Sequence, residues 1–396
     1  MGVIYMDNNA TTRVDPAVAE KMLPYFTEMY GNPSSMHSFG GQAGVKIEEA
    51  RARVAGLIGA QPEEIIFTSC GTESNNTAIW AALKSNPDKR HIITTRVEHP
   101  AVKNLVEYLG KNGYRSTFIP VDKSGQLDMD FFYKNLTEDT AIVSVMWANN
   151  ETGVIFPIEE IAHLVHERGI VFHSDAVQAA GKLSVNVNRV LVDMLSLSGH
   201  KLHAPKGVGA LYVRKGTKFS PFLVGGHQEK GRRGGTENVA SIIGLGKAIE
   251  LAQQRHDDVN KRIRALRDRL EKKLLEKIPN SMINGDLEMR LPNTTSIAFE
   301  YVEGEAILLM MNEMGICASS GSACTSGSLE PSHVLRAMGV PFTAAHGSIR
   351  FSLSVYNTEE EVDFVIEKLP PIIERLRQMS PFWLDREGSS NICSIQ

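Results

Sequence analysis

Two polar side chains, each placed after an apolar run, have the chemistry to hold and activate a carbonyl compound. Lys201 follows the run Asp193 to Leu197 and the turn Ser198-Gly199-His200, and Asp175 follows the run that begins at Ile170. Lys201 comes 26 positions after Asp175, about one strand-helix-strand step along the chain. At the carboxyl edge of an α/β sheet, where ligands bind, such a lysine can form a Schiff base with pyridoxal phosphate and the aspartate can keep the pyridine nitrogen protonated. A solvated lysine and a capping aspartate are the alternative.

A turn of small residues offers what a phosphate needs. The segment Thr68-Ser69-Cys70-Gly71-Thr72-Glu73-Ser74 lies between the apolar run Ile65 to Phe67 and a helical run from Asn75. Small residues expose backbone N–H groups at a helix N-terminus, and hydroxyl groups add donors. An ordinary helix cap is the alternative. His99 follows the run 92–97, where an imidazole can stack on a pyridine ring and move protons near neutral pH, or serve only in a structural hydrogen bond.

The four cysteines differ in their surroundings. Cys324 lies in the segment 319–328, which holds five Ser and two Gly in ten residues and predicts an exposed loop with a reactive thiol. Cys317 ends an apolar run and is expected in the core, Cys70 is expected to be a packed small residue, and Cys393 a bystander in a polar tail. No CxxC pair occurs, which argues against a zinc site or a disulfide scaffold and favours a reducing compartment.

Alternating elements must position these residues. Between about residue 40 and residue 250, helical patterns alternate with β-branched runs, which predicts an α/β fold with a mostly parallel central sheet flanked by helices. The helices are predicted at 42–58 and 157–168, and the strands at 64–68, 91–97, 141–146, 170–173 and 193–197.

The texture changes after Val239 to long helical patterns followed by strands at 294–299 and 348–354. Thr358 and Glu361 form a capping box for a helix through Gln378, which Pro370-Pro371 should kink or interrupt. We predict a large domain over 15–254, a smaller α+β domain from 1–14 and 255–380, and a disordered tail over 381–396.

Composition and charge exclude several classes of protein. The chain has 396 residues, with 42 Lys and Arg against 46 Asp and Glu, and no long basic block, so a nucleic-acid partner is not expected. No apolar stretch approaches the roughly 20 residues of a membrane span, and the first 30 residues lack a signal-peptide pattern. We predict a cytoplasmic protein without a membrane partner.

Four motifs together resemble the cysteine desulfurases, which belong to the fold-type I, class V aminotransferase-like pyridoxal phosphate enzymes. Details in 68–74 and 145–153 most resemble the nitrogen-fixation (NifS-like) type, and the match extends from about Tyr5 to about Ser380. The four motifs are Tyr5-Met6-Asp7-Asn8-Asn9-Ala10-Thr11-Thr12, Gly31-Asn32-Pro33-Ser34-Ser35-Met36-His37, Ser198-Gly199-His200-Lys201 and Ser319-Ser320-Gly321-Ser322-Ala323-Cys324.

The resemblance implies a role for each matched residue. Lys201 would carry the cofactor, His99 would accept the substrate thiol proton and Cys324 would attack the substrate sulfur. Asp175 would pair with the pyridine nitrogen, and Arg350, helped by Asn32, would bind the substrate carboxylate. The remaining cofactor contacts would be Gln178 and Asn149 at the phenolic oxygen, Gly71, Thr72, Ser198 and His200 at the phosphate, and Thr236 at the phosphate of a partner subunit.

The implied function is conversion of L-cysteine to L-alanine with a persulfide on Cys324. The sulfur would pass to a scaffold protein for iron–sulfur cluster assembly, in nitrogenase maturation if the nitrogen-fixation type is right. A shared site implies a homodimer. No metal is implied in the resting enzyme, and transient ligation of a cluster by Cys324 stays open. The alternatives are a housekeeping desulfurase, a selenocysteine lyase and, less favoured, an aminotransferase, which has no use for Cys324.

Overall fold

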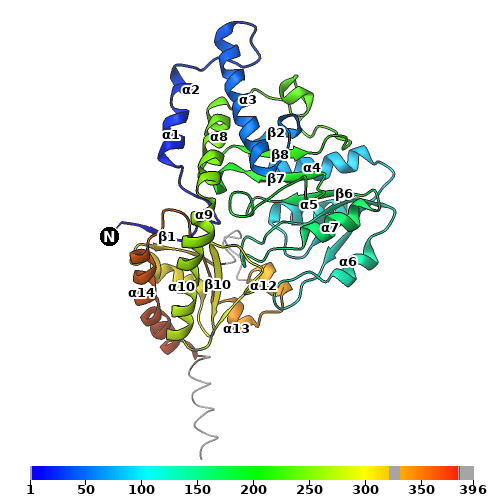
Figure 1. The fold of residues 1–396 in the computed structure, drawn as a ribbon. Coiled ribbons are helices and arrows are strands. Elements are labelled where there is room, and N and C mark those ends of the chain that lie inside the picture. Colours follow the sequence, from blue (N-terminus) through cyan, green and yellow to red (C-terminus); the bar gives the residue numbers. More distant parts are fainter. Residues whose placement is uncertain (1, 321–330, 382, 384–396) are drawn as a thin grey trace, which may run out of the picture.

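The computed structural model describes residues 2–320, 331–381 and 383, and its main layer is a seven-stranded sheet (Figure 1). The strand order is β2-β8-β7-β6-β5-β3-β4, with β8 antiparallel to both neighbours and the other pairs parallel. The mostly parallel sheet is as predicted. Its strands are β2 (Ile65–Thr68), β3 (His91–Thr95), β4 (Arg115–Ile119), β5 (Thr140–Ser144), β6 (Val171–Asp175), β7 (Met194–Ser198) and β8 (Gly209–Val213).

Helices cover both faces of this sheet because its strands are apolar on both sides. Successive residues of a strand face opposite sides. Ile65 and Phe67 accordingly join a core cluster with α3 and α8, whereas Ile66 joins another with α4 and α5. The flanking helices are α3 (Ser38–Ile58), α4 (Gly71–Ser85), α5 (Pro100–Lys111), α6 (Met129–Asn135), α7 (Ile158–His166) and α8 (Val239–Gln254), preceded by α1 (Pro16–Met22) and α2 (Pro24–Thr27).

A second sheet, antiparallel and four-stranded, has the order β12-β13-β10-β9. Its own core includes Ile4 and Met6 from the N-terminus, while Val334 and Leu335 join the core of the large sheet. The domain boundaries stay a prediction. The strands here are β1 (Ile4–Tyr5), which pairs with β11 (Ile316–Cys317), β9 (Ser281–Ile283), β10 (Thr294–Phe299), β12 (Ser319–Ser320) and β13 (Ser348–Ser352). The helices are α9 (His256–Asp258), α10 (Arg264–Lys277), α11 (Gly304–Glu313), α12 (His333–Ala337), α13 (Phe342–Ala345) and α14 (Glu359–Gln378).

Single turns of other helix types connect these elements. Three are 3₁₀ turns and one is a π-helical turn between α9 and α10. They span Pro62–Glu64, Gly199–Lys201, Gln228–Gly231 and Val259–Ile263.

The expectation that Pro370-Pro371 interrupts the last helix is wrong, and the expected kink stays a prediction. Helix α14 opens on the predicted Thr358 capping box and runs through both prolines to Gln378. Pro370 has no N–H to donate to the carbonyl of Ile366. That carbonyl instead accepts from Lys277 Nζ at 3.4 Å, so a side chain from α10 replaces the missing bond.

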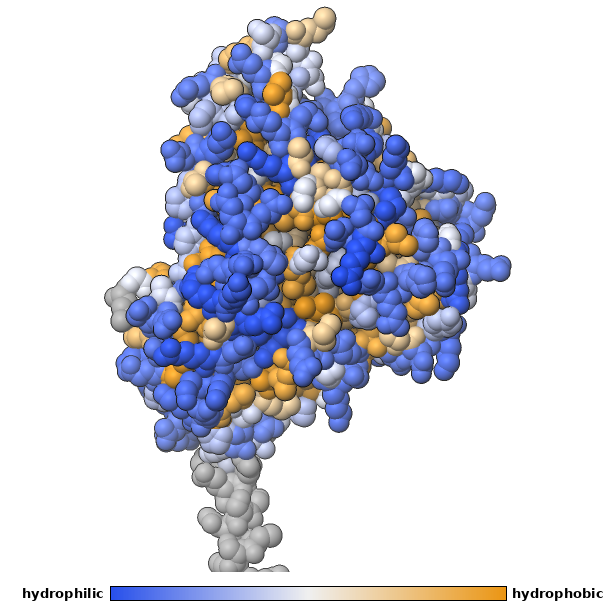
Figure 2. All heavy atoms as spheres, viewed as in Figure 1, coloured by the Kyte–Doolittle hydropathy of each residue, from blue (hydrophilic) through white to orange (hydrophobic). Residues whose placement is uncertain are grey.

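Hydrophilic residues cover most of the face seen in Figure 2, and apolar side chains reach it in scattered groups. Among the described residues, no helix is both long and apolar enough to cross a membrane.

Trp383, within the segment 381–396, lies against the ring of Tyr301 and the guanidinium of Arg377.

Candidate active site

A cavity of about 350 Å³ lies where the carboxyl ends of β2, β3, β6 and β7 meet. Four of the residues that line it lie at or just after strand ends. Asp175 is the last residue of β6 and Ser198 the last of β7, while Gly71 comes shortly after β2 and His99 shortly after β3. Nine of the predicted residues line it, namely Gly71, Thr72, His99, Asp175, Gln178, Ser198, His200, Lys201 and Arg350.

The N-terminal segment holds Lys201. The lysine amine donates to the backbone carbonyls of Asn9 and Ala10, at 2.6 Å each. Thr12 in turn bonds through its N–H and its hydroxyl group to the carbonyl of His200, both at 3.0 Å. The turn that carries the lysine is therefore bonded to a segment almost 190 residues earlier in the chain.

Asp175 is a buried carboxylate with two firm donors. Asn75 Nδ2 donates to its Oδ2 at 2.6 Å, and the N–H of Val177 donates to its Oδ1 at 2.9 Å. These bonds orient the carboxylate at the cavity wall. The sequence interpretation assigned Asn75 no role, although it lies four residues after Gly71 and so on the same face of α4, a spacing that could have revealed it.

The turn that opens α4 makes a cradle for an anion. Cys70, the N-cap, makes no side-chain capping bond, which leaves N–H groups of the first turn to another acceptor. A Cβ atom on Gly71 would lie 2.9 Å from Val177 Cγ2, and one on Gly209 would lie 2.8 Å from the carbonyl of Leu197. Without a Cβ atom, Gly71 packs closely against Val177 and Gly209 packs closely against the backbone of Cys70 and Leu197. The Ser198 Oγ atom is buried and finds no hydrogen-bond partner among the described residues, as expected for a donor that awaits a phosphate.

Pyridoxal phosphate fits these residues. The cavity is within the usual size range for a small-molecule site. It combines an amine for a covalent bond, a fixed carboxylate and a phosphate cradle with an unpartnered hydroxyl group.

Arg350, on β13, brings a positive charge from the second sheet. Its Nη2 contacts Asp7 Oδ1 at 2.7 Å and its Nη1 donates to the carbonyl of Asn150 at 3.1 Å. Its Nε is buried and has no partner among the described residues. The guanidinium is thus held in place while a donor remains for an incoming carboxylate.

His99 caps α5, and this bond settles which ring nitrogen carries its proton. The N–H of Ala101 donates to His99 Nδ1 at 3.1 Å, so the neutral ring has its proton on Nε2. Burial lowers the pKa of His99, which favours this neutral form. In this arrangement Nε2 carries a donor hydrogen, and His99 lines the cavity. The predicted acceptance of a thiol proton requires the other tautomer.

Two buried carboxyl groups were missed by the sequence interpretation. Burial raises the pKa of Glu98 to about 8 and that of Glu151, which lines the cavity, to about 7. Glu98 Oε1 accepts from Thr95 Oγ1 and from the N–H of Met146, whereas its Oε2 has no partner within the described ranges. Their sequence positions, one beside His99 and one in a loop, gave no sign of burial.

Four predicted residues are not among those that line the cavity. Asn149 is buried behind the wall, where its Oδ1 accepts from the N–H groups of Glu151 and Thr152. Asn32 and Thr236 are exposed. Cys324 lies outside the described residues, as do most of the predicted tail and residues 321–328 of the predicted loop. The expectation of an exposed loop is wrong for Ser319 and Ser320, which are buried and form β12.

The aminotransferase class-V family matches residues 4–365. The chain belongs to this family. A cysteine desulfurase of Nostoc sp. (strain PCC 7120) is 61% identical over 388 residues, which cover 98% of this chain and 97% of that relative. The cysteine desulfurase NifS of Azotobacter vinelandii is 60% identical, covering 97% and 96%. A solved structure of a NifS-like protein has a TM-score of 0.89 at 40% identity, covering 94% of this chain and all of that one.

These similarities confirm the resemblance to the cysteine desulfurases. They also confirm the fold class, that of fold-type I enzymes, and the dependence on pyridoxal phosphate. The cytoplasmic location and the individual residue roles stay predictions.

We expect Glu98→Gln to stabilise the protein more at pH 8 than at pH 5. The folded state keeps a proton on Glu98 up to about pH 8, whereas the unfolded state releases it near pH 4.5. The free energy of unfolding of the wild type therefore falls between these values as pH rises, and glutamine, which mimics the protonated acid, removes this loss. The gain at pH 8 should exceed that at pH 5 by about 1.4 kcal/mol or more.

Urea unfolding of both proteins at the two pH values measures the difference, and titrating groups common to both cancel. Glu107→Gln, on the exposed face of α5, is the control. An equal effect of Glu98→Gln at pH 5 and pH 8 would show that Glu98 is ionised in the folded protein.

Proposed function

We propose that the protein converts L-cysteine to L-alanine and leaves the sulfur as a persulfide on Cys324. The observation that carries this proposal is the meeting of Lys201, Asp175 and Arg350 around one cavity. A lysine and a carboxylate suit the cofactor, and the arginine suits the carboxylate of an amino acid. The relatives named as cysteine desulfurases support cysteine as that amino acid.

Arg350 orients the substrate. Asp7 and the carbonyl of Asn150 occupy one side of its guanidinium, so the substrate carboxylate takes the remaining donors, including Nε. This placement turns the amino group of the substrate toward Lys201. Asp7 neutralises part of the positive charge of Arg350. The charge that remains binds the carboxylate of an amino acid, and no second cation is required.

Lys201 and His99 handle protons. When bound, pyridoxal phosphate withdraws the electron pair left on the substrate's α carbon. Lys201 Nζ takes the α proton and later returns one. His99 meets the substrate thiol group through Nε2, and it accepts the thiol proton there after its ring changes to the Nδ1-protonated tautomer, which gives up the bond from the N–H of Ala101.

Cys324 accepts the sulfur. Its thiolate attacks the substrate sulfur, an S–S bond forms and the C–S bond breaks. The electron pair of that C–S bond stays with carbon, which is protonated to give alanine. The sum is cysteine plus enzyme thiol giving alanine plus enzyme persulfide, and no external oxidant is needed.

The Cys324→Ala variant should keep the visible absorbance of bound cofactor and lose alanine formation by at least about 100-fold, because only sulfur transfer is removed. Alanine release and sulfide release in the presence of a thiol reductant are measured together. Cys317→Ala, on β11, is the matched control and should keep most activity. Normal turnover by Cys324→Ala would exclude this thiol as the acceptor.

We also propose a homodimer in which each subunit completes the site of the other. Asn32 and Thr236 are exposed, and their neighbouring segments line a second cavity of about 310 Å³ that includes Pro33, Ser34 and Glu237. Arg51 and Glu229 join these segments through a buried ion pair, with Nη1 and Oε2 2.6 Å apart. Apolar side chains nearby in the sequence are largely exposed, namely Leu23, Phe26, Tyr30, Met36 and Val45. A second copy would cover them and bring Thr236 to a phosphate.

Light scattering should give a mass near twice 43.6 kDa. Phe26→Asp should shift the protein toward monomer and weaken cofactor binding by at least about tenfold, because a charge would enter the interface. Phe342→Asp, at a side chain that is 70% exposed on α13, is the control and should stay dimeric. A wild-type monomer that binds cofactor fully would contradict the shared site.

The sulfur acceptor is proposed to be a scaffold for iron–sulfur clusters in nitrogenase maturation. The 60% identity to NifS of Azotobacter vinelandii supports this assignment over a housekeeping role. Expression in a nitrogen-fixing bacterium that lacks its own NifS should restore acetylene reduction, and expression of Cys324→Ala should not. If the wild-type protein forms alanine in vitro but does not restore acetylene reduction, the desulfurase activity stands and the nitrogenase role is refuted.

A further inference from the structure

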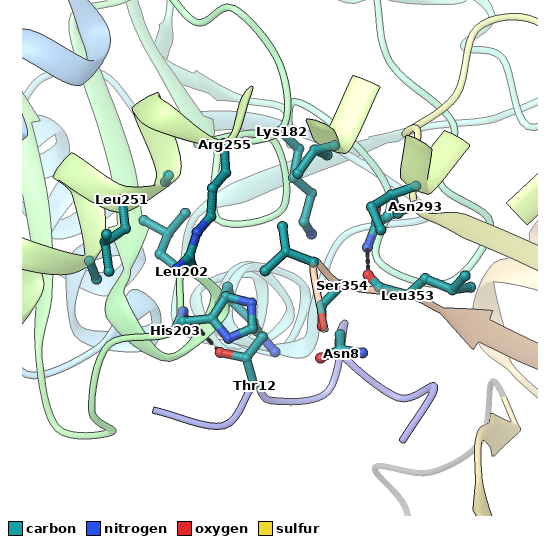
Figure 3. Close-up of a pocket in the computed structure, with 17 residues that line it drawn as sticks. Asn8, Thr12, Lys182, Leu202, His203, Leu251, Arg255, Asn293, Leu353 and Ser354 are labelled. Carbon is teal, nitrogen blue, oxygen red and sulfur yellow. Dashed lines mark hydrogen bonds between the residues drawn. The ribbon is translucent and has the colours of Figure 1, made fainter. Parts of the chain in front are cut away.

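Lys182 lies directly behind the cavity that contains Lys201. It lines a separate small pocket of about 60 Å³ between α8 and residues 353–355 (Figure 3). Lys201 lines both this pocket and the larger cavity, whereas Lys182 is not among the residues that line the cavity. Lys182 is therefore close to the site without facing the space for substrate.

In the described part of the chain, the amine of Lys182 donates to the oxygen atoms of two side-chain amides. Its Nζ lies 2.8 Å from Gln178 Oε1 and 3.4 Å from Asn9 Oδ1. Among the described residues, no carboxylate pairs with it. Burial, reinforced by the positive charges of Lys201 and Arg350, lowers its pKa to about 7.

Burying a lysine without a carboxylate partner lowers the stability of the folded protein, and an apolar side chain of similar length would fill the same space at a smaller loss of stability. The presence of a lysine at this buried position therefore points to a role beyond packing. An amide has a donor end and an acceptor end, and its orientation is set by its neighbours. In its charged form, which predominates below about pH 7, the Lys182 amine only donates, so it selects the oxygen end of each amide that it meets.

We infer that Lys182 is a positioning residue, which fixes the amide of Gln178 with its oxygen away from the cavity and its NH₂ group available to the cofactor. Gln178 Nε2 donates one hydrogen to the backbone carbonyl of Asn9 at 3.0 Å. Its other hydrogen meets no acceptor in the described part of the chain, and Gln178 lines the cavity. The same Asn9 carbonyl accepts from Lys201 Nζ at 2.6 Å, so one atom links both groups.

The consequence concerns the phenolic oxygen of pyridoxal phosphate, and it rests on the proposed role of Gln178 at that oxygen. An N–H at the wall stabilises a negative oxygen there. If the amide turned over, its own oxygen would face that group and repel it. Lys182 opposes this inversion because Gln178 Oε1, at 2.8 Å, is its shorter contact, and the other acceptor that the described residues offer it, Asn9 Oδ1, lies 3.4 Å away.

The test is a double-mutant cycle on the holoenzyme. Lys182→Met should raise the dissociation constant for pyridoxal phosphate about tenfold, as expected for loss of one charge-assisted hydrogen bond, and should shift the visible absorbance maximum of the bound cofactor. In a Gln178→Ala background, Lys182→Met should change the constant less than about twofold, because the amide is already gone. Lys182→Gln keeps an N–H donor and should stay within about threefold of wild type.

The controls separate this inference from general effects. Lys261→Met, at a side chain that is 77% exposed, should leave binding and absorbance unchanged. Equal binding and spectra for wild type and Lys182→Met, or additive effects of the two substitutions, would overturn the inference. If Lys182→Met does not fold, a tenfold loss in Lys182→Gln that is equally large with Gln178→Ala would overturn it too. A wild-type protein that binds no cofactor would instead refute the proposed function.

Discussion

The active site depends on hydrogen bonds from residues 7–12 to both sheets. This N-terminal segment reaches the second sheet through the pairing of Asp7 with Arg350 and through a bond from the N–H of Asn9 to Ser352. It reaches the first sheet through Thr12 and the lysine turn, and through the carbonyls that hold Lys201. Lys201 follows a strand of the first sheet and Arg350 lies on the second, and this segment bonds to both residues. Together with the bond from Arg350 Nη1 to the carbonyl of Asn150, this segment sets the distance between the two side chains.

Charge in the cavity is biased toward binding anions. Lys201 and Arg350 line it, and Asp175 is held at its wall by Asn75. Glu151 also lines it and Glu98 lies close by, but burial raises the pKa of both, so much of their negative charge is suppressed near neutral pH. A phosphate and an amino-acid carboxylate therefore enter a region whose remaining charges favour them. Burial keeps Glu98 and Glu151 largely uncharged, which reduces their repulsion of anionic ligands in the cavity.

The sequence predicted residues whose position follows from local order. Asp175, Ser198 and Gly71 lie at strand ends, and parallel strands bring such ends to one edge. Asn9 and Lys182 could not be assigned because their partners are chosen by tertiary packing, with 192 residues between Asn9 and Lys201. Pro370 was misjudged for the same reason, since Lys277 on another helix supplies the compensating bond. Asn32 and Thr236 are exposed and do not line the cavity, so their roles stay predictions.

Several amide side chains surround this site, where they form hydrogen bonds without adding charge. Each amide can present either its oxygen or its NH₂ group, and a neighbouring group must set which of the two faces the cavity. Groups that only donate or only accept remove the ambiguity. The backbone N–H groups of Glu151 and Thr152 fix the oxygen of Asn149, the carboxylate of Asp175 fixes the NH₂ end of Asn75, and Lys182 fixes the oxygen of Gln178. The donors and acceptors presented to a cofactor are thus decided one layer behind the cavity wall, where a substitution changes the chemistry of the site without touching its ligand.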